Sequence, residues 1–132
     1  MAVVSRSVAT RRIIGDDLDP DETTRLLGAK PTAQSRKGEQ NSSGYSAQRG
    51  IWRLSATEKV PGDLNTQINE LFAKVTPDLS VWADLIRKFR CDIFCGLFTQ
   101  NGNKGEQLEP RTLAMLRSRG LQLGLDIYGP GD

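Results

Sequence analysis

The chain has 132 residues, with 18 lysines and arginines against 16 aspartates and glutamates, and 37% of its residues are hydrophobic. This composition is that of one globular domain with its own core, and it excludes a disordered chain. The chain contains no histidine, which excludes Ser–His and Cys–His nucleophile pairs, histidine-ligated zinc and a histidine general base.

The N-terminal segment predicts only one weakly patterned strand, over residues 8–14, and residues 1–7 are expected to be disordered. This segment lacks the continuous apolar stretch of a signal peptide, and Asp16 and Asp17 follow it directly. No apolar run in the chain approaches the ~18 residues of a membrane span. We therefore expect a cytoplasmic protein that does not enter a membrane.

The stretch DDLDPDETTRLLG, residues 16–28, carries five carboxylates in its first seven positions. Asp19, Pro20 and Glu22 occupy the N-cap, first and third positions of a capping box, and negative charge suits the start of a helix. A calcium loop would need the order D-x-[DN]-x-[DN]-G, which is missing here. The stretch therefore predicts a helix over 20–27 that ends at a glycine, and not a metal site.

Residues 29–48 are polar and rich in Ser, Gln and Gly, which predicts a long surface loop. The following GIWRLS predicts a strand. Basic and aromatic side chains gather on these two segments, and such residues anchor protein interfaces or bind phosphates and stack on bases. The alternative is a solvated loop with the tryptophan turned into the core. The candidate partner-binding residues are Arg36, Lys37, Tyr45, Arg49, Trp52 and Arg53.

The middle of the chain predicts a helical hairpin. Apolar residues recur at helical spacing over 64–75, and a second stripe follows over 79–89, so both stripes are expected in the core. The next segment, CDIFCGLF, is apolar on both faces and predicts a strand inside a sheet. Its Cys91 and Cys95 would share one face about 13 Å apart, too far for a disulfide. We expect buried, reduced thiols.

The C-terminal part predicts a loop over 99–107, a helix from Pro110 to about Arg119, and a last strand. Leu121, Leu123, Leu125 and Ile127 alternate with other residues in that strand, as on a strand with one buried face. Asp92 and Asp126 lie on the opposite faces of their strands from the apolar residues. If the strands are neighbours, these acids with Tyr128 could form an acid–base pair, although separate ion-paired acids are the simpler interpretation.

The segments that begin at Leu18 and Leu108 share a leucine, an acid, a proline and a later leucine in register. Each follows a predicted strand and precedes another. We therefore predict an α+β fold with a sheet of about four strands, built from two strand–helix–strand units joined by the helical hairpin. Right-handed crossovers would make each unit a parallel pair, with the helices on one face, in a sandwich related to the ferredoxin-like plan.

The stretches GDDLDPDETTRLLGAKPT, RKGE, GIWRLS, DLNTQI and LGLDIY, in this order, resemble the bacterial family of domain of unknown function 4279, from about Ile13 to Tyr128. The family has no assigned reaction. The resemblance implies a small cytoplasmic protein of the kind that often acts as an immunity-like partner of a toxin.

We therefore expect a non-enzymatic protein without cofactor or metal, which occludes a protein partner, plausibly a toxin, through the 29–53 surface. The balance of charges permits contact with nucleic acid without requiring it. The alternative is a module that binds a small ligand or RNA through the same basic loop and strand. A carboxylate-dependent enzyme is the third hypothesis.

Overall fold

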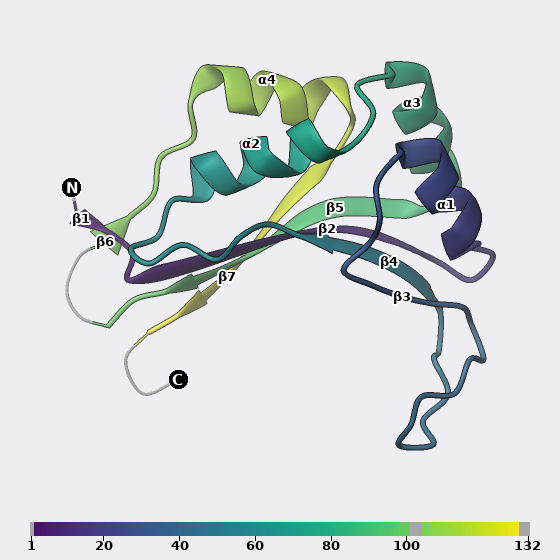
Figure 1. Ribbon diagram of the computed structural model, residues 1–132. Helices are drawn as coiled ribbons and strands as arrows, with labels where there is room; N and C mark the ends of the chain where they lie inside the picture. Colours follow the sequence, from purple (N-terminus) through teal and green to yellow (C-terminus); the bar gives the residue numbers. More distant parts are fainter. Residues whose placement is uncertain (1, 101–103, 130–132) are drawn as a thin grey trace.

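The computed structural model describes residues 2–100 and 104–129, and four helices cover one face of a five-stranded sheet (Figure 1). Within the described residues, no helix lies on the other face of the sheet. The α+β class and the one-sided helix layer are as predicted, but the sheet has five strands instead of about four. The sheet strands are β2 (Arg6–Gly15), β3 (Ala33–Ser35), β4 (Gly50–Ser55), β5 (Arg90–Phe98) and β7 (Gln122–Tyr128). The helices are α1 (Pro20–Leu27), α2 (Leu64–Lys74), α3 (Leu79–Lys88) and α4 (Pro110–Ser118).

The N-terminal residues also form structure. β1 (Ala2–Val3) pairs in parallel with β6 (Lys104–Gly105), and β2 begins at Arg6. We expected disorder over residues 1–7, and this expectation is wrong for residues 2–3 and 6–7, which lie in strands. Part of the loop expected over 99–107 lies outside the described residues.

The order of strands in the sheet is β3–β4–β2–β5–β7. β5 and β7, which flank α4, are parallel, as the second strand–helix–strand unit predicts. The prediction of a parallel pair is wrong for the first unit. Its second strand was expected in GIWRLS, which is β4, and β4 runs antiparallel to β2. The strand that follows α1 is the short β3, which pairs antiparallel with β4 and therefore runs in the same direction as β2. The hairpin between β3 and β4 places β4 between the two parallel strands of that unit.

The acidic stretch begins α1, as its sequence predicts. A carboxylate oxygen of Asp19 accepts hydrogen bonds from the backbone N–H groups of Asp21 at 3.1 Å and Glu22 at 3.4 Å. Gly28 ends the helix with a positive φ of 69°, a conformation that glycine adopts without steric cost. Glu22 does not complete the box in the expected way, since its carboxylate accepts hydrogen bonds from Arg25.

The core lies between the helix layer and the facing side of the sheet. Trp52 of β4 and Trp82 of α3 are both fully buried there. Each indole N–H has an acceptor at 3.0 Å, which is the Thr24 hydroxyl for Trp52 and the Thr76 carbonyl for Trp82. Both predicted helical stripes contribute to this core, through Leu64, Ile68, Leu71, Phe72, Val75, Trp82 and Leu85.

The last strand departs from its predicted pattern along its length. Leu121, just before β7, is buried, but Leu125 is 52% exposed and Ile127 is 62% exposed. β7 is an edge strand, and its far half runs away from the helix layer (Figure 1). The alternation therefore predicted the strand correctly but not how far the helices cover it.

Candidate binding face

The sheet face turned away from the helices carries most of the charged and aromatic side chains of the strands. Successive residues of a strand point to opposite faces, and Ala9, Ile13, Ile93 and Cys95 belong to the core. The residues that alternate with them along each strand therefore form what we call the open face. Its charged and aromatic members are Arg6, Arg12, Arg53, Arg90, Asp92, Phe94, Phe98, Asp126 and Tyr128.

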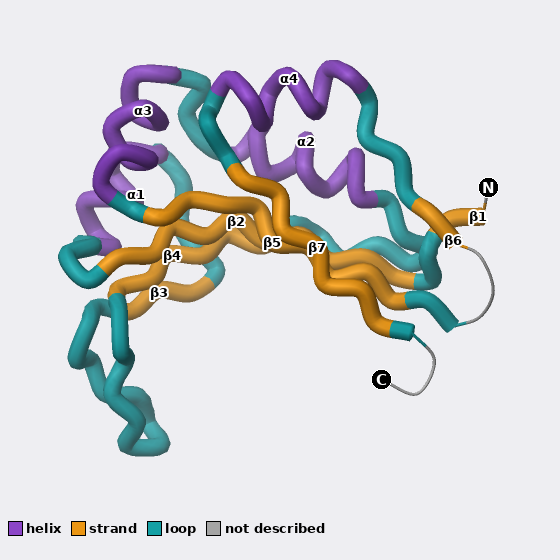
Figure 2. Tube along the Cα trace, turned by 180° about the vertical axis from the view of Figure 1, so that it is seen from behind, coloured by secondary structure: helices purple, strands orange, loops and turns teal. Residues whose placement is uncertain are grey.

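The loop over 36–49 hangs from the β3–β4 edge of the sheet, on the side opposite the helices (Figures 1 and 2). Its Tyr45 is 76% exposed. Arg49, at the end of this loop, is exposed and directly precedes β4. The loop and the open face thus lie on the same side of the molecule and can contact one partner together.

Arg12 and Asp92 form an ion pair with two hydrogen bonds on the open face. The Arg12 Nε donates to one Asp92 oxygen at 2.9 Å, and a terminal nitrogen donates to the other at 2.7 Å. This hydrogen bond raises the pKa of Arg12 above its ordinary value. The guanidinium also lies over the Phe94 ring at 4.5 Å. Asp92 is 3% exposed, so its role here is to hold an arginine in place.

Arg6, Phe98 and Tyr128 stand side by side on β2, β5 and β7. The Arg6 guanidinium lies 3.7 Å from the Phe98 ring centroid, and the Tyr128 ring stacks on Phe98 at 4.7 Å with an angle of 7° between the planes. Since β5 lies between the other two strands, the arginine and the tyrosine cover opposite faces of Phe98. The Tyr128 hydroxyl donates to Asp126 at 2.6 Å, and this bond raises the tyrosine pKa.

The register of β5 and β7 rules out an acid–base pair between Asp92 and Asp126. β5 and β7 are neighbours, but Asp126 lies opposite Gly96, four residues along β5 from Asp92. Four residues of a strand span about 13 Å. Asp92 is bound by Arg12 and Asp126 by Tyr128, so the two carboxylates cannot share a proton directly.

The six predicted partner-binding residues fall into three groups. Trp52 is fully buried and cannot anchor a partner, because its side chain lies on the core face of β4. Arg36 pairs with Asp19 and Asp21, and Lys37 pairs with Asp16, so the acids beside α1 neutralise both. Tyr45, Arg49 and Arg53 are exposed on the side of the open face.

Sequence reasoning missed several open-face residues, namely Arg6, Arg12, Arg90, Phe94 and Phe98. The available signal was spacing by an even number of residues, which is six from Arg6 to Arg12 in RSVATRR and four between successive members of Arg90, Phe94 and Phe98 in RCDIFCGLF. That pattern places these side chains on one face of each strand. Only the pairing of β2 with β5 brings the two sets together.

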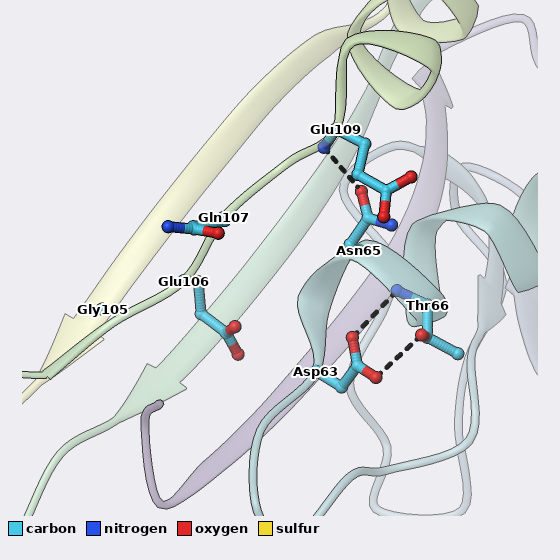
Figure 3. A pocket seen from close by; sticks show the side chains of 7 residues that line it. All are labelled: Asp63, Asn65, Thr66, Gly105, Glu106, Gln107 and Glu109. Atoms are coloured by element: carbon cyan, nitrogen blue, oxygen red, sulfur yellow. Dashed lines mark hydrogen bonds between the residues drawn. The ribbon is translucent and has the colours of Figure 1, made fainter. Parts of the chain in front are cut away.

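A polar hollow of about 460 Å³ lies near the starts of α2 and α4 (Figure 3). Three of its side chains, Asp63, Asn65 and Glu106, already have hydrogen-bond partners. Asp63 accepts from the Thr66 N–H at 3.2 Å and from its hydroxyl at 2.7 Å, and Asn65 accepts from the Glu109 N–H at 2.9 Å. Glu106, whose pKa burial raises, accepts from the Leu64 N–H at 3.3 Å. These contacts hold the starts of α2 and α4 in place.

Within the described ranges, no helix is long and apolar enough to cross a bilayer. The family of domain of unknown function 4279 matches the chain over residues 6–130, which is nearly its whole length. The chain therefore belongs to this family, as the resemblance of its motifs implies. No curated protein and no solved structure gave a significant match.

Proposed function

We propose that this member of the domain of unknown function 4279 family is a non-enzymatic, cytoplasmic binding protein, which occludes an acidic surface of a protein partner with its open face and the 36–49 loop. One observation carries the proposal. Arg53 lies directly opposite Arg12 on the open face, and Arg53 is exposed and forms no ion pair within the described part of the chain. Asp92 already balances the charge of Arg12, so the charge of Arg53 is the one that an acidic partner would meet.

The charge of the open face supports an anionic partner. Four arginines and two aspartates lie there, Asp92 is bound by Arg12, and Arg6 forms an ion pair with Glu58. Arg90 is 60% exposed and lies 3.8 Å from Asp92. Arg49 adds a further positive charge where the loop joins β4. Arginine and tyrosine are the side chains that most often dominate the binding energy of protein interfaces.

The aromatic geometry favours a protein over a single-stranded nucleic acid. Proteins that bind single strands stack bases on the faces of aromatic rings. Here Arg6 and Tyr128 cover both faces of Phe98, and Arg12 covers Phe94. RNA is the second candidate partner because the open face is basic. Binding of RNA predicts a steep loss of affinity with added salt.

An immunity protein that neutralises a toxin would work in this way. A flat arginine-rich face would cover an acidic region of the toxin, and the exposed Tyr45 would contribute an apolar contact at one side. No group of this chain would need to react. Charge complementarity of this kind accelerates association and excludes wrong partners.

The test is a pull-down from lysate of the native host. Tagged wild-type protein is compared with the variant Arg53→Glu/Arg90→Glu and with the control Arg111→Glu/Arg117→Glu, which makes the same charge change on exposed residues of α4. We expect one stoichiometric protein to be retained by the wild type and the control and to be lost from the open-face variant. Equal retention by all three proteins would contradict the proposed surface. An eluate of nucleic acid alone, removed by salt, would favour RNA.

A further inference from the structure

Arg11 is an arginine in the centre of the core. Its side chain is on the helix face of β2, between Ala9 and Ile13, and the residue is fully buried. Its guanidinium carbon lies 4.2 Å from the ring centroid of Trp82 and 5.1 Å from that of Phe72. Charged side chains are almost never fully buried unless they are paired.

No described protein atom accepts a hydrogen bond from Arg11. All three of its nitrogens are buried without a partner. The two aromatic rings attract the positive charge, but they do not replace hydrogen-bond acceptors for the five N–H groups. A buried donor without an acceptor is strongly unfavourable, so this arrangement calls for an acceptor that the described part of the chain does not supply.

A second arginine lies near the same Phe72 ring. Arg119, just after α4, is 8% exposed, and its guanidinium carbon lies 4.8 Å from the centroid of the same Phe72 ring. One of its terminal nitrogens donates to the Met115 carbonyl and the Ser118 hydroxyl, but its buried Nε has no partner. Neither arginine makes an ion pair with a described acid. The positive charge of Arg119 adds to burial in lowering the pKa of Arg11.

We propose that Arg11 and Arg119 form a binding site for a small oxyanion, of the phosphate, sulfate or carboxylate class, between the sheet and the helix layer beside Phe72. The planar fork of a guanidinium matches two oxygens of such an anion. One bound anion would supply acceptors to one edge of the Arg11 guanidinium and to the Nε of Arg119, and it would offset the repulsion between the two charges. This site is on the opposite side of the sheet from the open face and is independent of the proposed protein interface.

The experiment compares the wild type with Arg11→Met and Arg119→Met by thermal unfolding. Sodium phosphate is titrated at constant ionic strength against sodium chloride, and sodium sulfate and sodium acetate follow as further probes. We expect the unfolding temperature of the wild type to rise with the logarithm of the phosphate concentration above the dissociation constant, by about 5–10 °C at about 100 times that constant. Both variants should lose this rise, and Arg11→Met should be at least as stable as the wild type in chloride alone, because it removes an unpaired buried charge.

Phosphate and sulfate also stabilise proteins without a specific site, and the variants control for that effect. An equal rise in the wild type and in Arg11→Met would overturn the proposal, and so would no rise beyond that in chloride. If the Met variants do not fold, binding to the wild-type site is read directly from Trp82. A Trp52→Phe protein has Trp82 as its only indole, and its fluorescence should change saturably with phosphate. A flat titration would overturn the proposal.

Discussion

Arg12 and Asp92 face each other across β2 and β5 and are joined by two hydrogen bonds, of 2.9 and 2.7 Å. The pair links the two strands at the middle of the sheet. It also explains how an aspartate that is 3% exposed is tolerated there, since a buried carboxylate needs a bound cation.

Breaking this pair should destabilise the protein. We expect Arg12→Met to lower the free energy of unfolding by about 2 kcal/mol, because it leaves the buried Asp92 charge without its partner. The loss should be smaller than for a fully buried pair, since the Arg12 side chain is 24% exposed. Urea unfolding of Arg12→Met, Asp92→Asn and the double variant measures the coupling. Strictly additive effects of the two changes on the free energy of unfolding would contradict a coupling between Arg12 and Asp92.

The cap of α1 gives a second prediction. Replacing Asp19 with Ala removes the acceptor of two backbone N–H groups, and we expect the unfolding temperature to fall by about 4 °C at pH 7. The matched change of the exposed Asp17 should have little effect.

The effect of Asp19 should also depend on pH. The hydrogen bond from the Glu22 N–H is the main cause that lowers the pKa of Asp19. The ionised carboxylate is thus the stabilising form, and its contribution is complete above the ordinary aspartate pKa and is lost as the pH falls through the lowered value. The difference in unfolding temperature between wild type and Asp19→Ala should therefore begin to shrink below about pH 4 and disappear below the lowered pKa of Asp19. A difference that persists in acid would rule out the charged cap.

Truncation of Trp52 should lower the stability of the protein far more than truncation of Tyr45. Trp52→Ala should cost about 3–5 kcal/mol of stability, because it opens a cavity in the core. Tyr45→Ala should change stability by less than about 0.5 kcal/mol, because Tyr45 is 76% exposed. Chemical denaturation checks both values. A mild effect at Trp52 would contradict its burial.

The two cysteines should not react in the native protein. Cys91 and Cys95 are buried and free, and burial raises the pKa of each thiol to about 12. At pH 8 only about one thiol in ten thousand is then a thiolate, the form that reacts. A thiol reagent should label neither residue before unfolding and both after it. Rapid labelling of one native thiol would show that its surroundings open readily.

The helices were predictable because their signals are local. The cap residue Asp19, the terminal Gly28 and the apolar stripes of α2 and α3 each act over a few residues. α1 has the predicted bounds for the same reason. The presence of the long strands follows in the same way from their alternation, and the short β3 was missed because three residues carry too little pattern.

The sequence by itself determined the α+β class, the helix boundaries, the family and the absence of histidine chemistry. Only the tertiary structure decided that β4 lies between β2 and β3, that Asp92 and Asp126 are apart, and that Trp52 and Arg11 are in the core. The physical reason is that alternation assigns residues to two faces of a strand, but which face is covered depends on helices distant in the sequence. Strand register likewise depends on non-local pairing, so the arginines of the open face could be recognised as one surface only after the sheet was assembled.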